Sequence, residues 1–316
     1  MIDGSLASAA VQVTVGGAVN LPAAMTLFSI ASNVLWSYFV FFVVFLVGLV
    51  VIFLHGHWQE TQGFDKLIPF GPVFYAAPLA AFGTEHFTIT KIIASLIPAW
   101  IPWHYFFAYF VGACFIAAGF SLVTRIQVRL SASLLALTFL LFVALMDAPG
   151  WFRRPGDRFA LALMLRELSF GAGPLALAAS LTEQWREWCT HILATIARYI
   201  IAIAVFYYSF EQFLHGDHVP GIPLAMVTPE KVFGHGLWTY LTAVVYAVAG
   251  ISLLIGKKTR AAAIWIGLTV LFVVLVAYVP IAVLEGANFE GFNYMADTLM
   301  FGGTVLLLAG TLPRET

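Results

Sequence analysis

The feature that most constrains this chain is a series of continuous apolar runs, each about twenty residues long. A helical run of that length spans the hydrocarbon core of a bilayer. The runs do not alternate between apolar and polar residues, as the strands of a membrane barrel do. Because 61% of the residues are hydrophobic and only 10% are charged, we predict an all-α polytopic membrane protein.

Nine runs are long enough to cross a membrane. One is expected at 33–54, and the others form two groups of four: 67–87, 104–124, 130–148 and 159–181, then 191–214, 236–255, 261–284 and 291–312. Residues 1–32 carry one charge, Asp3, and lack the basic residues of a secretory signal. We interpret them as an exposed or interfacial arm.

The two groups of four are copies of one unit. A shift of 131 positions superimposes residues of many types, including Pro98 on Pro229, His104 on His235, Arg129 on Arg260 and Pro149 on Pro280. A period of this length is too long for a solenoid repeat. Each copy holds an even number of helices, so both copies enter the membrane from the same side. We therefore predict parallel four-helix bundles related by a pseudo-two-fold axis along the membrane normal.

We therefore divide the chain into four parts: an arm at 1–32, an additional helix and loop at 33–64, repeat one at 65–188 and repeat two at 189–316.

The basic residues predict the orientation of the chain in the membrane. One side collects Lys66, Arg125, Arg129, Arg186, Arg198, Lys257, Lys258, Arg260 and Arg314, and the other collects Lys91, Arg153, Arg154, Arg158 and Lys231. The positive-inside rule makes the first side cytoplasmic. We expect a bacterial-type inner (plasma) membrane protein with its N-terminus outside and its C-terminus in the cytoplasm.

Some partners and sites are disfavoured by the composition. The net charge is −1 and the basic residues are scattered, so a nucleic-acid surface has no electrostatic basis. Cys114 and Cys189 lie far apart and match no zinc or redox spacing. The sequence contains no G-x-S-x-G, P-loop, H-E-x-x-H or G-x-G-x-x-G motif. We expect membrane lipids and other membrane or redox subunits as partners.

Acidic and imidazole side chains recur at the predicted outer face. A shift of 126 carries Glu85 to Glu211, and the shift of 131 carries His104 to His235. Histidine titrates near neutrality, and a carboxylate near the interface is readily shifted into that range. The candidate proton or quinone site is therefore Glu85, His86, His104, Glu211, His215 and His235. Alternatively, these are helix-end residues in the headgroup zone, where polar groups cost little.

Three ionisable residues lie deeper in the predicted membrane region. The shift of 131 places Arg166 on Asp297, and Glu167 is adjacent. Ionisable groups at this depth normally face the bundle interior and are paired. We predict an intramembrane ion pair from these three residues. A structural lock between the two halves and a substrate or proton site both fit, and either Glu167 or Asp297 could be the partner of Arg166.

Two equivalent outer connections separate the helices. The first, Thr88–Trp103, is apolar and is expected to lie in the interface or to fold back as a lid. The second, Gly216–Gly234, is more polar, and a solvated loop is the simplest expectation. The spacing of His215 and His218 around Asp217 could also suit a metal ion, although the sequence assigns no metal site.

Several segments resemble the DoxX/DoxD-like family of four-helix membrane proteins. They are FGTEHF (82–87), IPAWIPWHYFFAYFVGACFIAAGFSL (97–122), SFEQF (209–213), TPEKVFGHGLWTYLTAVVYAVAGISLL (228–254) and FNYMADTLMFGG (292–303). The resemblance covers about 67–312, whereas family members usually have one unit and lack the leading helix. It implies a four-helix fold and a respiratory neighbourhood, since the family is named after subunits associated with thiosulfate:quinone oxidoreductase and a terminal quinol oxidase.

Three functions fit these observations. The first is a membrane subunit of a respiratory or redox complex that handles quinone or protons at the outer face, with an apolar cleft between the two bundles. The second is a structural accessory subunit without a site of its own. The third is a small-molecule transporter, in which 171–174 is the candidate helix break. Quinone is the one cofactor that this reading suggests.

Overall fold

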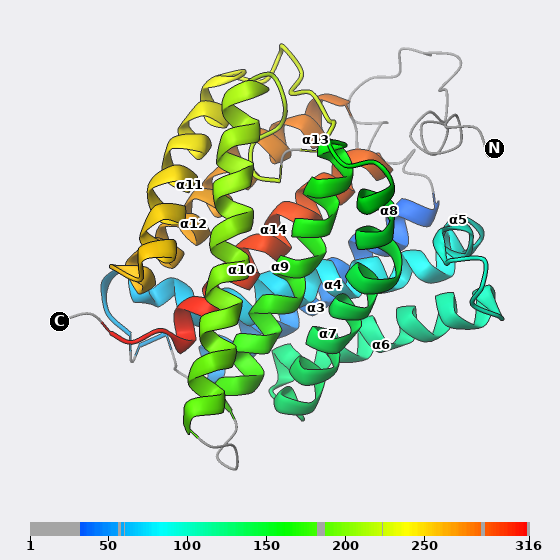
Figure 1. Ribbon diagram of the computed structural model, residues 1–316, viewed down its shortest axis with the longest axis horizontal. Helices are drawn as coiled ribbons and strands as arrows, with labels where there is room; N and C mark the ends of the chain where they lie inside the picture. The colour runs from blue at the N-terminus through cyan, green and yellow to red at the C-terminus, as the bar shows by residue number, and fades with distance from the viewer. Residues whose placement is uncertain are drawn as a thin grey trace.

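The computed structural model describes residues 32–55, 58–59, 61–181, 187–222, 224–285 and 288–314. The predicted arm lies outside the described residues except at its last position. The helices, shown in Figure 1, are α3 (Ser32–Leu54), η1 (Gly63–Phe70), α4 (Gly71–Thr88), α5 (Thr90–Leu96), α6 (His104–Thr124), α7 (Val128–Phe142), η2 (Val143–Asp147), α8 (Ala148–Arg153), α9 (Arg158–Ser180), α10 (Glu187–Leu214), α11 (Leu237–Ile255), α12 (Thr259–Val273), η3 (Val274–Tyr278), α13 (Val279–Glu285) and α14 (Phe289–Thr311).

The predicted fold class is confirmed. Within the described residues, nine helical segments are long and apolar enough to cross a membrane. No strand forms in the same part of the chain, where the only strand-like pairing is an isolated bridge between His218 and Val227. The chain is therefore a multi-pass membrane protein whose backbone polar groups are satisfied within its helices. We call the side that carries residues 215–236 the loop face; α4 and α10 end there, and α9 and α14 begin there.

The helix ends repeat at the shift of 131. Val128–Phe142 becomes Thr259–Val273, and Arg158–Ser180 becomes Phe289–Thr311, without a change in length. Each of the latter two helices begins at a side-chain cap, because Asp157 and Asn288 both accept hydrogen bonds from backbone N–H groups of the first turn. The two copies therefore share local geometry as well as sequence.

Each repeat also contains one widened helical turn at the equivalent place. The π-helical turns η2 and η3 lie shortly before Pro149 and Pro280. Proline lacks the N–H that would bond one turn back, and its ring clashes with the carbonyl four residues earlier. A π turn relieves this clash within a continuous helix. In contrast, the candidate helix break at 171–174 is not present, because α9 continues through Pro174 as an α-helix.

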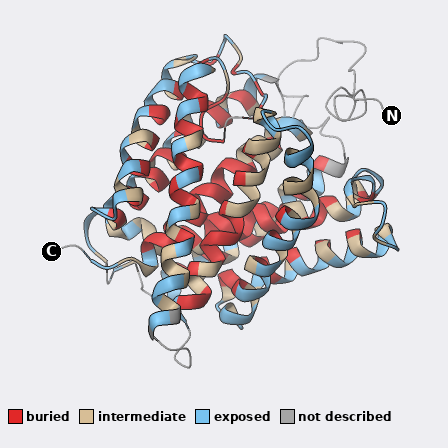
Figure 2. Cartoon of the chain, in the orientation of Figure 1, coloured by how far each residue is buried: buried red, intermediate tan, exposed pale blue. Residues whose placement is uncertain are grey.

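The centre of the molecule is α14, which is largely buried (Figure 2). It packs against α4 as α9 packs against α10, and α9 and α14 are themselves in contact. Small residues permit this approach: a Cβ atom on Gly173 would lie 2.9 Å from Cα of Thr304, its equivalent in repeat two. The expected apolar cleft between the bundles is therefore filled at these described positions by helices in direct contact.

Candidate functional site

A charged triad lies where α9 meets α14. Arg166 Nη1 donates to Asp297 Oδ2 at 2.6 Å, and Nη2 donates to Glu167 Oε1 at 2.8 Å. Arg166 lies eight residues after the start of α9, or about 12 Å along the axis from the loop face. Arg166 therefore pairs with both of the candidate acids, Glu167 and Asp297, at the same time. The guanidinium faces the ring of Phe170, 5.9 Å from its centroid.

Two further carboxyl groups surround this triad. Glu85, near the end of α4, is 6% exposed and lies beside Asn293 and Asp297 of α14. Asp147, at the end of the π turn η2, is close enough to interact with Arg166 and Glu167. We call the five ionisable residues of this region the central cluster; they are Glu85, Asp147, Arg166, Glu167 and Asp297.

The central cluster is rich in polar atoms that lack partners. Within the described residues these buried atoms are Glu85 Oε1, Asp147 Oδ2, Arg166 Nε, Glu167 Oε2 and Asn293 Oδ1. Most buried polar side-chain atoms in proteins have a hydrogen-bond partner, so several orphans in one place call for an explanation. Two of the four carboxyl groups, those of Glu167 and Asp297, bond the single guanidinium, and this excess of acids favours a site that binds protons or cations.

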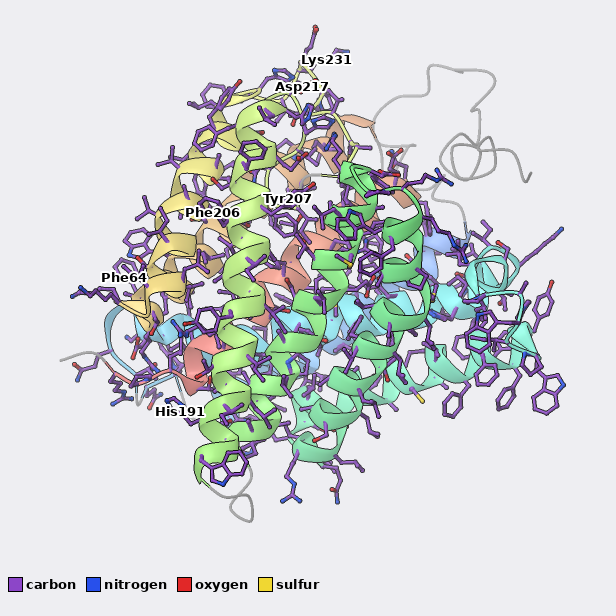
Figure 3. All side chains as sticks on the ribbon, viewed as in Figure 1. Phe64, His191, Phe206, Tyr207, Asp217 and Lys231 are labelled. Carbon is purple, nitrogen blue, oxygen red and sulfur yellow. The ribbon has the colours of Figure 1, made fainter. Side chains whose placement is uncertain are left out.

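Glu211, the repeat equivalent of Glu85, lies in a different environment. Arg158 Nη1 donates to Glu211 Oε2 at 2.7 Å, and its Nη2 donates to the carbonyl of Leu224 at 3.4 Å. The Tyr207 hydroxyl donates to the carbonyl of Arg158 at 3.0 Å and helps to fix the start of α9; Figure 3 labels Tyr207 on α10. Glu211 is thus neutralised by a cation, whereas position 289, the equivalent of Arg158, holds phenylalanine.

The expectation of a solvated second connection is wrong, because the chain folds back into the bundle there. Ile222 belongs to the main hydrophobic core, and Gly221 contacts Thr298 next to Asp297. The Tyr294 hydroxyl accepts hydrogen bonds from two backbone N–H groups of this segment, each at 2.9 Å. Because Tyr294 and Thr298 belong to α14, the segment closes the loop-face end of the central helices.

The first connection differs from the second. It forms the short helix α5 and an exposed turn in which Trp100 and Trp103 point outward. Exposed tryptophans are compatible with the interfacial alternative of the sequence prediction, because tryptophan favours the headgroup region of a bilayer. Figure 1 shows α5 at the ends of α4 and α6, away from α14.

The six residues of the predicted proton or quinone site do not form one site. His86 Nδ1 is hydrogen-bonded to the carbonyl of Phe82 at 2.8 Å, and His104 Nε2 to that of Pro98 at 3.2 Å. His235 is exposed. No hydrogen bond or ion pair in the described part joins any of these three histidines to Glu85 or Glu211.

Within that set, the described residues form one acid–imidazole contact, in which His215 Nε2 lies 3.9 Å from Glu211 Oε2. The next histidine, His218, is mostly buried in the folded-back segment. Burial is the largest cause that lowers the pKa of His218 below 6.5. The Asp217 carboxylate opposes this shift and the Arg158 guanidinium reinforces it. His218 is therefore expected to be neutral near pH 7.

Two contributors escaped sequence reasoning. Asp147 is not among the candidate residues that the sequence suggests, yet it sits in the π turn beside the charged triad. Arg158 was counted as a loop charge, yet it neutralises Glu211 from the other repeat. The 131-residue offset between the repeats could have identified both residues, because it aligns Asp147 with Tyr278 and Arg158 with Phe289. Such replacements between copies mark places where the halves have diverged.

Comparison with models of known protein families, with curated proteins and with solved structures found no match to this chain.

Proposed function

We propose that the chain is a membrane subunit of a redox complex that exchanges protons between the loop face and the central cluster. The observation that carries the proposal is an excess of four carboxyl groups over one guanidinium in the central cluster, with carboxyl oxygens of Glu85, Asp147 and Glu167 left without partners among the described residues. The redox association extends the DoxX/DoxD-like resemblance of the sequence. We assign quinone binding to a partner subunit, because α9 and α14 are in contact where an apolar cleft between the two bundles was expected.

The electrostatics of the central cluster favours proton binding. A carboxylate without a counter-ion is costly within the membrane region, and neighbouring carboxylates disfavour each other's charged forms. Arg166 compensates one negative charge and Glu167 and Asp297 already share it. Glu85, beside Asp297 and without a cation of its own in the described part, is the group most favoured to hold a proton. It is also the member nearest to the loop face along its helix.

Infrared difference spectroscopy of the purified, lipid-reconstituted protein tests this proposal. At neutral pH we expect the carbonyl band of a protonated carboxyl group, which shifts on transfer to D₂O because the proton exchanges. Glu85→Gln removes or reduces the band, whereas Glu211→Gln, at the repeat-equivalent acid held by Arg158, leaves it intact. A spectrum without a protonated carboxyl, or one in which both variants behave alike, refutes the assignment and favours a structural accessory subunit.

A second candidate, a transporter of small cations, is favoured by one observation. The π turns at equivalent positions place a widened helix segment, with Asp147 at its end, beside the cluster. Such turns are frequent at functional sites. Uptake of a labelled organic cation into proteoliposomes that is lost in Asp147→Asn would support this function. A response to pH alone, with no uptake above that of protein-free liposomes, would support proton exchange instead.

A further inference from the structure

Three potential metal ligands meet where α10 ends. His215, Asp217 and His218 each offer one ligand atom, and these atoms lie within 4.8 Å of one another. The rings of the two histidines are 5.0 Å apart at 79°. Asp217, labelled in Figure 3, lies in the loop beyond the helix and is the exposed member. We call these residues the loop triad.

The backbone of the loop triad is held by bonds to its surroundings. The N–H of His218 donates to the carbonyl of His215 at 3.1 Å, and the N–H of Thr228 donates to the carbonyl of Asp217 at 2.8 Å. The Thr239 hydroxyl donates to the carbonyl of His218 at 2.6 Å. These bonds tie the triad to α11 and to the segment that returns from the loop, so the backbone of the ligands is held at both places.

The side chains leave coordination capacity unused. His218 Nδ1 is buried without a hydrogen-bond partner in the described part, and lies 3.6 Å from Asp217 Oδ1. Ligands about 2.0–2.2 Å from a tetrahedral zinc ion are roughly 3.3 Å apart. The ligand atoms lie within 4.8 Å of one another, so their separations have to contract by at most about 1.5 Å to reach this spacing, and the exposed Asp217 side chain is free to move toward the two imidazoles.

We propose that the loop triad binds one divalent transition-metal ion, with zinc the best match. Two imidazoles and one carboxylate suit zinc, copper or nickel, whereas calcium and magnesium prefer all-oxygen sites. Three protein ligands leave a fourth position for water or a partner's side chain. Glu211, 3.9 Å from His215 Nε2, is placed to orient that imidazole, as carboxylates behind metal-bound histidines do.

Calorimetric titration of the untagged protein, stripped with a chelator, tests this site with Zn²⁺ alone as the probe. We expect saturable binding of one ion per chain. His215→Ala or His218→Ala weakens binding at least about tenfold, while the exposed His235→Ala does not. Binding that is unsaturable, or weakened equally by the His235 substitution, overturns the proposal.

A second measurement guards against variants that fail to fold. The Asp217 side chain is 59% exposed, so Asp217→Asn is expected to preserve the fold, as judged by helical circular dichroism and a monodisperse elution profile. Co²⁺ added to the wild-type chain should give the intense visible absorption of a four-coordinate ion, and Asp217→Asn should weaken it. A spectrum of hexa-aquo cobalt in the wild-type protein refutes the site.

Discussion

The ion pair between Arg166 and Asp297 supports a quantitative prediction by double-mutant cycle. Arg166→Met leaves Glu167 and Asp297 without their guanidinium, in a cluster that already holds two further carboxyl groups. Removing one partner of a buried pair costs roughly 3–5 kcal/mol. Asp297→Asn instead removes one acid from an excess of acids, and Arg166 keeps Glu167. We expect this substitution to lower the free energy of unfolding by only about 1.5–3 kcal/mol, the scale of a hydrogen bond to a charged group.

The two side chains are 20% and 8% exposed, so water replaces little of the lost interaction. We expect the double variant to show a coupling energy of roughly 1–3 kcal/mol. The free energy of unfolding is measured in mixed micelles with increasing dodecyl sulfate. Arg198→Met is the matched control, because within the described part of the chain Arg198 donates to the carbonyl of Leu253, stacks on Tyr199 and forms no ion pair. The reasoning is refuted if the single variants cost the same, or if their effects add within about 0.5 kcal/mol.

Further predictions concern the axis and the loop face. Gly173→Ala places a methyl group against the α14 backbone and should lower the free energy of unfolding by about 1–3 kcal/mol. Gly150→Ala is the control: a Cβ atom there would meet no atom within 4 Å, so this variant should be neutral or stabilising in the same unfolding assay. Arg158→Gln leaves the buried Glu211 without its cation, so amide exchange across 215–228 should accelerate; unchanged exchange would show that the ion pair does not hold this segment. The pKa of His218 is lowered in the fold, so its contribution to stability is present above its unfolded value of 6.5 and declines as the pH falls below it. In chelator-containing buffer this decline should disappear in His218→Gln, and a decline of the same size in both proteins would contradict the assignment.

Features set by local sequence could be predicted, whereas features set by packing between distant segments could not. The spans follow from run length and hydropathy, and they agree with the structure within a few residues. The duplication predicts that Arg166 and Asp297 meet, because equivalent residues lie close together if a two-fold axis relates the copies, and the two side chains do form an ion pair. The folded-back segment did not follow, because Ile222 and its neighbours are held by packing against distant helices. Nor did the place of Asp147, which depends on a π turn that hydropathy does not reveal.

The two repeats diverge where function is proposed, and this divergence gives a final prediction. Glu85 and Glu211 are equivalent, but only Glu211 has an arginine, supplied from the first residue of α9. Phe289 is the first residue of α14, which packs on α4 as α9 packs on α10. Phe289→Arg should therefore bring a guanidinium to Glu85, as Arg158 brings one to Glu211.

An arginine beside Glu85 would stabilise its ionised form and displace its proton. We expect the protonated-carboxyl infrared band of the lipid-reconstituted protein to diminish in Phe289→Arg and to persist in Phe289→Leu, which retains the apolar side chain. Comparison of the arginine and leucine variants separates the effect of the added charge from the effect of altered packing at position 289. If the band is unchanged in the arginine variant while the protein remains folded, Glu85 is not the proton-holding group, and the difference between the repeats has another cause.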